Sequence, residues 1–386
     1  MDAKKILKNK SFCVLPWTGF ELEPNGTIKN CIISKTILGD TQNKDILSIL
    51  QDNPNKKIKE QMLYDKKPKN CSGCHVQERG RKNLSSISSR LYYMKELAPS
   101  IDMTLYDNIE NFSLHHVDLR WTNHCNQACV YCGPEYSSKW AQEIGREIKS
   151  SMQARHNIKN FVFENVSKLK NVYLAGGEPL LMNENRELLK LLYEKNPNVN
   201  LRINTNLSST DTGVFDLICK FKNVHWTVSV EATGAQYEYI RYHGVWKKFI
   251  ENLQIIKNLD HKISFNMLYF LLNYKSIFNT IDFFKNIGFH ENSFIIGPLL
   301  EPKYLNILNL PEKLKDKIKF CLEEKILKSE HYLKNSYENI YNYINETKGK
   351  YEIQNFFTEI QKLDTRRKQS AEKIFPELFE DLKQNV

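Results

Sequence analysis

From about residue 116 to residue 300, short apolar runs alternate with longer stretches in which hydrophobic residues recur every three or four positions. The short runs have the length of strands, and the longer stretches have the period of amphipathic helices. Strands and helices that alternate in this way build a parallel sheet covered by helices. Six strands are expected, at 117–121, 172–175, 201–204, 226–230, 263–268 and 294–296.

These strand–helix units predict an α/β fold of a particular shape. Helices are expected at 138–149 and 185–194, where apolar residues recur on one helix face. Six units joined by right-handed crossovers indicate an open, partial (β/α)6 barrel. Barrels of parallel strands carry their chemistry at the C-terminal ends of the strands. Functional residues are therefore expected directly after the apolar runs.

The two ends of the chain differ from its middle in composition and in the pattern of apolar residues. At 386 residues the chain exceeds the ~250–300 residues that one hydrophobic core usually supports. Residues 1–110 hold four cysteines, a Pro-Asn-Gly turn and short helical stretches such as 55–64, and we expect a small cysteine-rich domain there. Residues 306–386 mix charged residues with Ile, Leu, Phe and Tyr and contain almost no glycine or proline. This pattern predicts a helical extension after a barrel at 111–305.

Charge and hydropathy narrow the function classes only slightly. The 55 Lys and Arg exceed the 45 Asp and Glu, for a net charge of +10, which could attract nucleic acid. Because the lysines are spread along the chain, we favour a solvated surface. No run of ~18 apolar residues occurs, and the N-terminus is lysine-rich. We therefore expect no membrane span and no secretory signal, and we predict a cytoplasmic protein.

The cysteines fall into two sets and two single positions, and a cytosolic chain favours metal binding or catalysis over disulfides. Cys125, Cys129 and Cys132 form a Cys-x3-Cys-x2-Cys loop directly after the first predicted strand. Three thiolates leave one iron of a 4Fe-4S cluster open for an external ligand. The alternative is a zinc knuckle completed by His124 or His156. Closed zinc sites usually come as paired Cys-x2-Cys hairpins, so the cluster is favoured.

This loop, with the aromatic Tyr131 before its third cysteine, resembles the hallmark of the radical S-adenosylmethionine (SAM) superfamily. The resemblance implies that the open iron binds the amino and carboxylate groups of SAM and that the backbone around Tyr131 meets the adenine. It further implies that one electron cleaves SAM into methionine and a 5'-deoxyadenosyl radical, which takes a hydrogen atom from a substrate. A flavodoxin- or ferredoxin-type electron donor is the partner expected from this resemblance.

A second motif ends the second predicted strand. In Gly176-Gly177-Glu178-Pro179 the glycines permit close backbone approach, and the carboxylate can accept hydrogen bonds from an ammonium group. The segment resembles the GGEP motif of the superfamily, which binds the methionyl amine of SAM. The same resemblance implies SAM contacts after later strands, at Asn206, Ser229, Glu231 and Arg241. For Arg241, a salt bridge within the protein is a nearly equal alternative.

Four more cysteines lie within residues 1–110. Cys13 and Cys31 bracket an Asn-Gly hairpin, and Cys71 and Cys74 form a Cys-x2-Cys pair. Four thiolates saturate either a zinc ion or a 4Fe-4S cluster, and spacing does not separate the two. The arrangement resembles the twitch domain, a half-sized SPASM module, which implies an auxiliary 4Fe-4S cluster, although such modules usually follow the barrel. Its continuation to Glu78 is similar to a subset of twitch-bearing radical SAM proteins.

Together these motifs predict a radical SAM enzyme, an oxidoreductase or modifying enzyme that abstracts a hydrogen atom from a peptide or protein side chain or from a small molecule. No catalytic residue or specific reaction is predicted, because a fold does not identify its substrate. The competing hypothesis is a non-catalytic zinc-binding module that binds nucleic acid, and the ordered GGEP segment counts against it. Cys219 and Cys321 are expected to be packing residues.

Overall fold

The computed structural model describes residues 9–42, 44–78, 88–146, 152–346 and 353–385. These residues contain one nine-stranded sheet with the strand order β3-β2-β1-β4-β5-β6-β7-β8-β9. The strands are β1 (Gly19–Leu22), β2 (Thr27–Lys29), β3 (Ile37–Asp40), β4 (His116–Leu119), β5 (Asn171–Leu174), β6 (Asn200–Thr205), β7 (Val224–Ser229), β8 (Lys262–Tyr269) and β9 (Phe294–Pro298).

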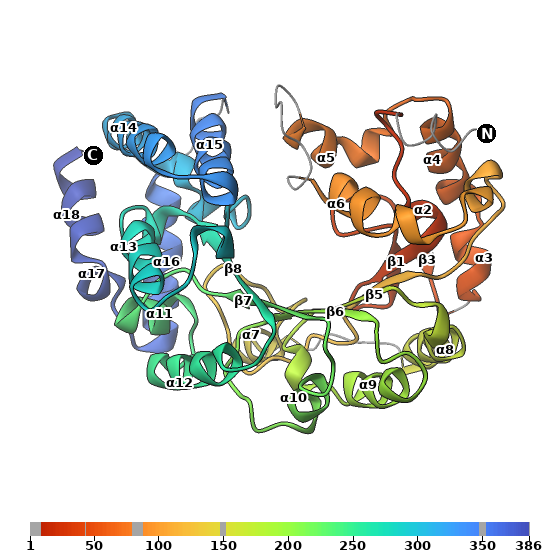
Figure 1. Ribbon diagram of the computed structural model, residues 1–386. Helices are drawn as coiled ribbons and strands as arrows, with labels where there is room; N and C mark the ends of the chain where they lie inside the picture. The colour runs from red at the N-terminus through yellow and green to blue at the C-terminus, as the bar shows by residue number, and fades with distance from the viewer. Residues whose placement is uncertain (1–8, 43, 79–87, 147–151, 347–352, 386) are drawn as a thin grey trace.

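Strands β4 to β9 are all parallel and confirm the six strands expected from the sequence. Within the described chain the sheet stays open, because β3 and β9 are its two edges. Figure 1 shows a curved half-barrel with helices beneath its convex face. These helices are α8 (Met152–Glu164), α9 (Asn183–Lys195), α10 (Gly213–Ile218) and α12 (Trp246–Lys257). The α/β partial-barrel fold is therefore confirmed.

Helix α7 (Ser138–Glu143) is shorter than the helix expected at 138–149. It is capped by Ile144 and followed by Gly145, whose φ of +65° lies in the left-handed region typical of helix C-termini. Residues 147–149 of the expected helix lie outside the described residues. The other two expected helices, 185–194 and 55–64, correspond to α9 and to α4 (Asn53–Leu63).

The cysteine-rich N-terminal region extends the same sheet. Strands β1 and β2 form the antiparallel hairpin expected around the Asn-Gly turn, where Gly26 has a φ of +89°. Strand β1 pairs in parallel with β4, so that Glu21 lies opposite Asp118. The helices of this region are α2 (Leu15–Thr18), α3 (Ile46–Leu50), α4, α5 (Ser72–Gln77) and α6 (Ser89–Glu96), with a small second core around Trp17. The boundary at 110–111 falls in coil before β4 and stays a prediction.

The chain after β9 is helical, as the sequence predicts. Its helices are α14 (Glu312–Lys328), α15 (His331–Glu346), α16 (Ile353–Arg367), α17 (Ala371–Ile374) and α18 (Pro376–Asn385). Leu322, Tyr337 and Phe356 bury their side chains in the main core, so this region packs against the barrel. Among the helices described here, none has the length and apolar character needed to cross a membrane.

The two faces of the sheet differ in polarity. Val117, Leu119, Val172 and Leu174 share one core with buried residues of α8 and α9, beneath the convex face. Because side chains alternate along a strand, the residues between them face the concave side. One row of Cα partners crosses this side, consisting of Glu21, Asp118, Tyr173, Arg202, His225 and Lys262. The concave face is therefore lined by polar and charged side chains.

Candidate active site

The three-cysteine loop follows β4 and is held by hydrogen bonds from two directions. The backbone N–H of Ala128 donates to the carbonyl of Tyr242 (2.9 Å). The indole Nε1 of Trp140, on α7, donates to the carbonyl of Cys129 (2.6 Å). The thiols of Cys125 and Cys129 are buried. The loop is thus fixed by the protein's own contacts.

The thiols of this loop influence one another and therefore share one site. Burial, followed by the nearby Cys129 thiol, raises the pKa of Cys132 to about 12. Burial, Cys129 and the Glu178 carboxylate likewise raise the pKa of Cys125. Binding of iron must therefore displace protons from these thiols. A cubane cluster, which would take each thiolate on a different iron, suits these three thiols. In the described residues no group of His, Cys, Asp or Glu is spaced to hold a single metal ion.

The Gly-Gly turn after β5 rests directly on the cysteine loop. Gly176 has a φ of +108°, and a Cβ atom on Gly177 would lie 2.1 Å from the carbonyl oxygen of His124. The backbone N–H of Glu178 donates to that same oxygen (2.7 Å). Only glycine permits this approach. The structure thus brings two motifs together that are about forty residues apart.

Glu178 itself is fixed at the centre of this contact. Its carboxylate accepts hydrogen bonds from the hydroxyl of Thr205 (2.6 Å) and from the backbone N–H groups of Asn206 (2.8 Å) and Leu180 (3.2 Å). Burial raises its pKa to about 7 although these donors act in the opposite direction. The amide Nδ2 of Asn206 lies 3.8 Å from the Cys125 sulfur. Three strand ends therefore meet beside the cysteine loop.

Arg241 forms a buried network with two other predicted site residues. Its Nε and Nη2 donate to the two carboxylate oxygens of Glu231, both at 2.8 Å, and Nη2 also donates to the Tyr131 hydroxyl at 2.7 Å. Its Nη1 lies 3.8 Å from the Cys129 sulfur. The salt bridge considered as an alternative for Arg241 is therefore present. A contact with SAM stays a prediction for all three residues.

The remaining predicted SAM residues lie at the same end of the sheet. Ser229 is the last residue of β7, is half-buried and pairs in register with Asn266 of β8. Pro179 is buried and begins the short 3-10 helix η5 (Pro179–Leu181). Both follow the strand-end pattern that the sequence predicts, and their contact with SAM likewise stays a prediction.

The four N-terminal cysteines also converge. Cys13 lies before α2, Cys31 follows β2, Cys71 ends the 3-10 helix η1 (Lys69–Cys71), and Cys74 lies in α5. Burial and the thiols of the other three raise the pKa of Cys13. A Cβ atom on Gly73 would lie 2.6 Å from Ile33, so glycine lets α5 approach the Cys31 loop. These four thiols suit a fully ligated cluster.

Glu78 connects α5 with the chain that carries Cys13. Its carboxylate binds Arg90 of α6, with Nη2 at 2.6 Å and Nε at 3.0 Å. The Nη1 of the same arginine donates to the carbonyl of Phe12 (3.0 Å). Glu78, the last residue of the Cys-x2-Cys-x3-Glu motif, therefore links α5 to α6 and, through Arg90, to the backbone next to Cys13.

Sequence reasoning missed a contact between the C-terminal region and the cysteine loop. Arg367 of α16 makes a double hydrogen bond with Glu143 of α7, at 3.0 to 3.1 Å. Its guanidinium lies 4.8 Å from the ring centre of Trp140 and 4.4 Å from that of Tyr242. Both aromatic residues hold the loop backbone. No local signal could have found this pair, because its members are 224 positions apart.

Two family models match the two parts of the chain that contain the cysteine sets. Residues 119–284 match the model of the radical SAM superfamily, and residues 13–75 match the SPASM model, described as an iron–sulfur cluster-binding domain. The chain therefore contains a radical SAM domain and, before it, an iron–sulfur cluster-binding domain, as predicted, and these matches support an enzyme. Its cofactors are SAM, the 4Fe-4S cluster that binds it and an auxiliary cluster. The second match favours a cluster over zinc at the N-terminal cysteines.

Individual relatives match only parts of the chain. A GTP 3',8-cyclase of Aliarcobacter butzleri is 24% identical over 173 residues, which is 44% of this chain and 51% of that protein. A 7-carboxy-7-deazaguanine synthase of Clostridium acetobutylicum is 40% identical over 68 residues, which is 18% of this chain and 27% of that protein. The chain thus spans about half the length, or less, of these curated relatives.

A weak similarity extends to solved structures that contain bound SAM. The structure of anSMEcpe with bound AdoMet has 17% identity and a TM-score of 0.42, covering 53% of this chain and 59% of that chain. Streptococcus suis SuiB bound to S-adenosylmethionine has 16% identity and a TM-score of 0.42, covering 80% of this chain and 69% of that chain.

Proposed function

We propose that this protein binds SAM at a 4Fe-4S cluster held by Cys125, Cys129 and Cys132 and abstracts a hydrogen atom from a substrate. A cluster held there, with one electron from a flavodoxin- or ferredoxin-type donor, would supply the reductive cleavage of SAM to methionine and a 5'-deoxyadenosyl radical that could take the substrate hydrogen atom. The substrate class is a peptide or protein side chain or a small molecule. The auxiliary cluster is assigned to Cys13, Cys31, Cys71 and Cys74.

The observation that carries this proposal is the contact between the Gly-Gly turn and the cysteine loop. The 2.1 Å approach at Gly177 leaves no space for a side chain, so two backbones meet beside three thiols. Glu178 lies at this contact and is held by three donors. In this proposal its carboxylate also accepts a hydrogen bond from the ammonium group of SAM. Such an arrangement suits a ligand that is bound through amine and carboxylate groups.

The neighbouring residues have separate roles in this proposal. The backbone at Tyr131 would contact the adenine, and the turn at Gly176 would lie against the methionyl group. Asn206, which follows β6, and Ser229, the last residue of β7, would lie near the ribose. Arg241 would pair with the SAM carboxylate while it keeps its contact with Glu231, because a guanidinium has five donor N–H groups.

Iron content and SAM cleavage test this proposal directly. After anaerobic reconstitution with iron and sulfide, we expect about eight irons per chain, since each 4Fe-4S cluster holds four. Addition of SAM and dithionite should produce 5'-deoxyadenosine. Replacement of Cys125, Cys129 and Cys132 by alanine should lower the iron content by about half and abolish deoxyadenosine formation.

The two remaining cysteines provide a matched control. Cys219 and Cys321 are half-buried and lie outside both sets, so C219A/C321A should keep the full iron content and full deoxyadenosine formation. Equal deoxyadenosine formation by the triple variant and the unaltered protein would overturn the proposal. A colourless protein that retains zinc after reconstitution would instead support the zinc-binding, nucleic-acid-binding alternative.

A further inference from the structure

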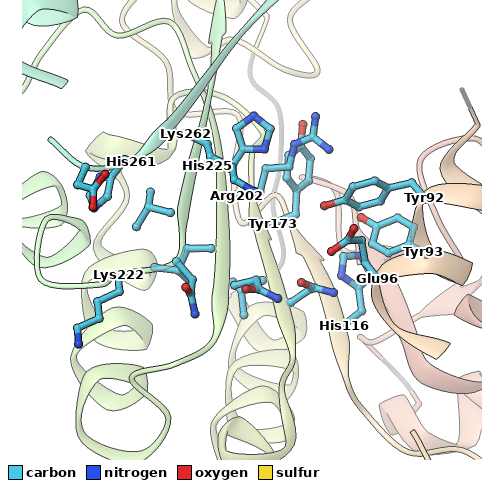
Figure 2. A pocket seen from close by; sticks show the side chains of 17 residues that line it. Tyr92, Tyr93, Glu96, His116, Tyr173, Arg202, Lys222, His225, His261 and Lys262 are labelled. Carbon is cyan, nitrogen blue, oxygen red and sulfur yellow. The ribbon is translucent and has the colours of Figure 1, made fainter. Parts of the chain in front are cut away.

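A cavity of about 360 Å³ opens on the concave side of the sheet, toward the N-terminal ends of the strands. Figure 2 shows that its walls come from two directions. Tyr92, Tyr93 and Glu96 of α6 lie on one side, and Tyr173, Arg202 and His225 of β5, β6 and β7 lie on the other. This volume lies in the range of small-molecule and side-chain binding sites. None of the sequence motifs described above contributes to it.

Arg202 is the central cation of this cavity and has no carboxylate partner in the described part of the chain. Its Nε donates to the hydroxyl of Thr227 (3.0 Å). Its guanidinium carbon lies 5.7 Å from the ring centre of Tyr92 and 5.6 Å from that of Tyr173. Two aromatic rings and hydrogen bonds with Thr227 and Tyr92 thus orient the guanidinium, and no ion pair with a described residue neutralises its positive charge. An oriented guanidinium is the group that binds carboxylate or phosphate in a two-pronged manner.

The histidines beside Arg202 remain neutral and offer hydrogen bonds. Burial, followed by the charge of Arg202, lowers the pKa of His225 to about 4. Burial lowers the pKa of His116 to about 3. The Nδ1 of His116 and the Nδ2 of Asn171 have no partner among the described residues, although these residues are only 3% and 8% exposed. Buried polar atoms of this kind require a ligand or water.

We propose that this cavity binds an anionic group of the substrate, a carboxylate or a phosphate, with Arg202 as its main ligand and with His116 and Asn171 as further hydrogen-bonding partners. The proposal rests on the function proposed above, because it assumes a substrate that reaches SAM. The anionic end of that substrate would lie at the opposite end of the strands from SAM. Arg202 lies four residues before Asn206, which is about 13 Å along an extended strand. A substrate anchored at Arg202 therefore presents to SAM a group about four extended peptide residues away.

Binding of two small anions to the reconstituted full-length protein tests the proposal. Pyrophosphate represents a phosphate source, and succinate represents a carboxylate source. Phenylglyoxal modification of Arg202, followed by mass spectrometry, should slow in the presence of at least one of them. Modification of the exposed Arg366, which lies far along the chain on α16, should not slow. Calorimetric affinity for the protecting anion should fall about tenfold or more in R202Q and less in R202K, which keeps the charge.

A control variant separates specific binding from general attraction. Lys222 lies exposed at the cavity rim, and K222Q should retain anion affinity within about twofold. Protection by pyrophosphate alone identifies phosphate as the recognised group, and protection by succinate alone identifies carboxylate. Absence of protection by both anions in the unaltered protein would overturn the proposal, as would equal losses in R202Q and K222Q. These assays do not measure SAM cleavage, so they can fail while deoxyadenosine still forms, or succeed when it does not.

Discussion

Glu21 is a fully buried carboxyl group on the concave face, between the two cysteine-bearing parts of the chain. Its Oε1 lies 3.2 Å from Arg120 Nε, but neither carboxyl oxygen receives a hydrogen bond from the described residues. Burial and the nearby Asp118 carboxylate raise its pKa from 4.5 to about 8, although Arg120 acts in the opposite direction. Two smaller effects oppose each other, because Glu23 raises the pKa of Glu21 and Lys29 lowers it. At neutral pH the group is thus mostly protonated in the folded protein.

This raised pKa predicts how stability changes with pH. Between about pH 4.5 and pH 8 the folded protein binds the Glu21 proton and the unfolded chain does not, so stability falls as pH rises through this window. E21Q removes the titrating group and keeps its size. We expect E21Q to be more stable than the unaltered protein near pH 8, by on the order of a few kcal/mol, and to differ little near pH 5. Unfolding by urea at both pH values measures this, and parallel pH dependences would contradict it.

Among the elements, the strands and the two loop motifs were predictable because their signals are local. Strands β4 to β9 show as apolar runs, and residues 125–132 and 176–179 carry complete motifs. The polar concave face also leaves a signal. In β6, Arg202 and Asn204 alternate with Leu201 and Ile203. A parallel strand covered on both faces is apolar throughout, so this alternation indicates a sheet with one polar face.

The Arg367–Glu143 pair, which braces α16 against α7, was not predictable from the sequence. It leads to a prediction of its own. The side chain of Arg367 is 1% exposed and that of Glu143 is 12% exposed. R367A leaves the carboxylate without its main partner, and breaking a buried pair costs on the order of 3–5 kcal/mol. Because Trp140 and Tyr242 lie between this pair and the cysteine loop, iron should also leave the reconstituted protein faster when a chelator is added. Thermal unfolding and the rate of chelation measure both effects.

The adjacent arginine provides the control for this brace. Arg366 is 38% exposed and reaches the same carboxylate through one contact of 3.2 Å. R366A should change stability by at most about 1 kcal/mol and should leave the chelation rate unchanged. If R366A and R367A behave alike, the stacking of Arg367 on the loop aromatics has no role in holding the cluster.

At the scale of the whole molecule, both cysteine sets lie next to strands of one sheet, but at opposite ends of these strands. Cys13 precedes β1 and Cys31 follows β2, and the antiparallel pairing places both at the N-terminal end of β1. Cys125 follows β4, which runs parallel to β1, and therefore lies at the opposite end. The cavity around Arg202 opens at the N-terminal ends as well. A substrate that spans the concave face (Figure 1) from the proposed SAM site would thus extend toward the proposed auxiliary site.

This separation predicts different consequences for the two cysteine sets. Replacement of Cys71 and Cys74 by alanine removes two ligands at the auxiliary site and leaves the cysteine loop after β4 in place. The variant should lose about half of its iron and still form deoxyadenosine, while conversion of substrate should be abolished if the auxiliary cluster exchanges an electron with the substrate radical. Circular dichroism checks that the overall secondary structure is retained. Unchanged iron content would show that these cysteines are not ligands, and normal product yield would exclude the electron-transfer role.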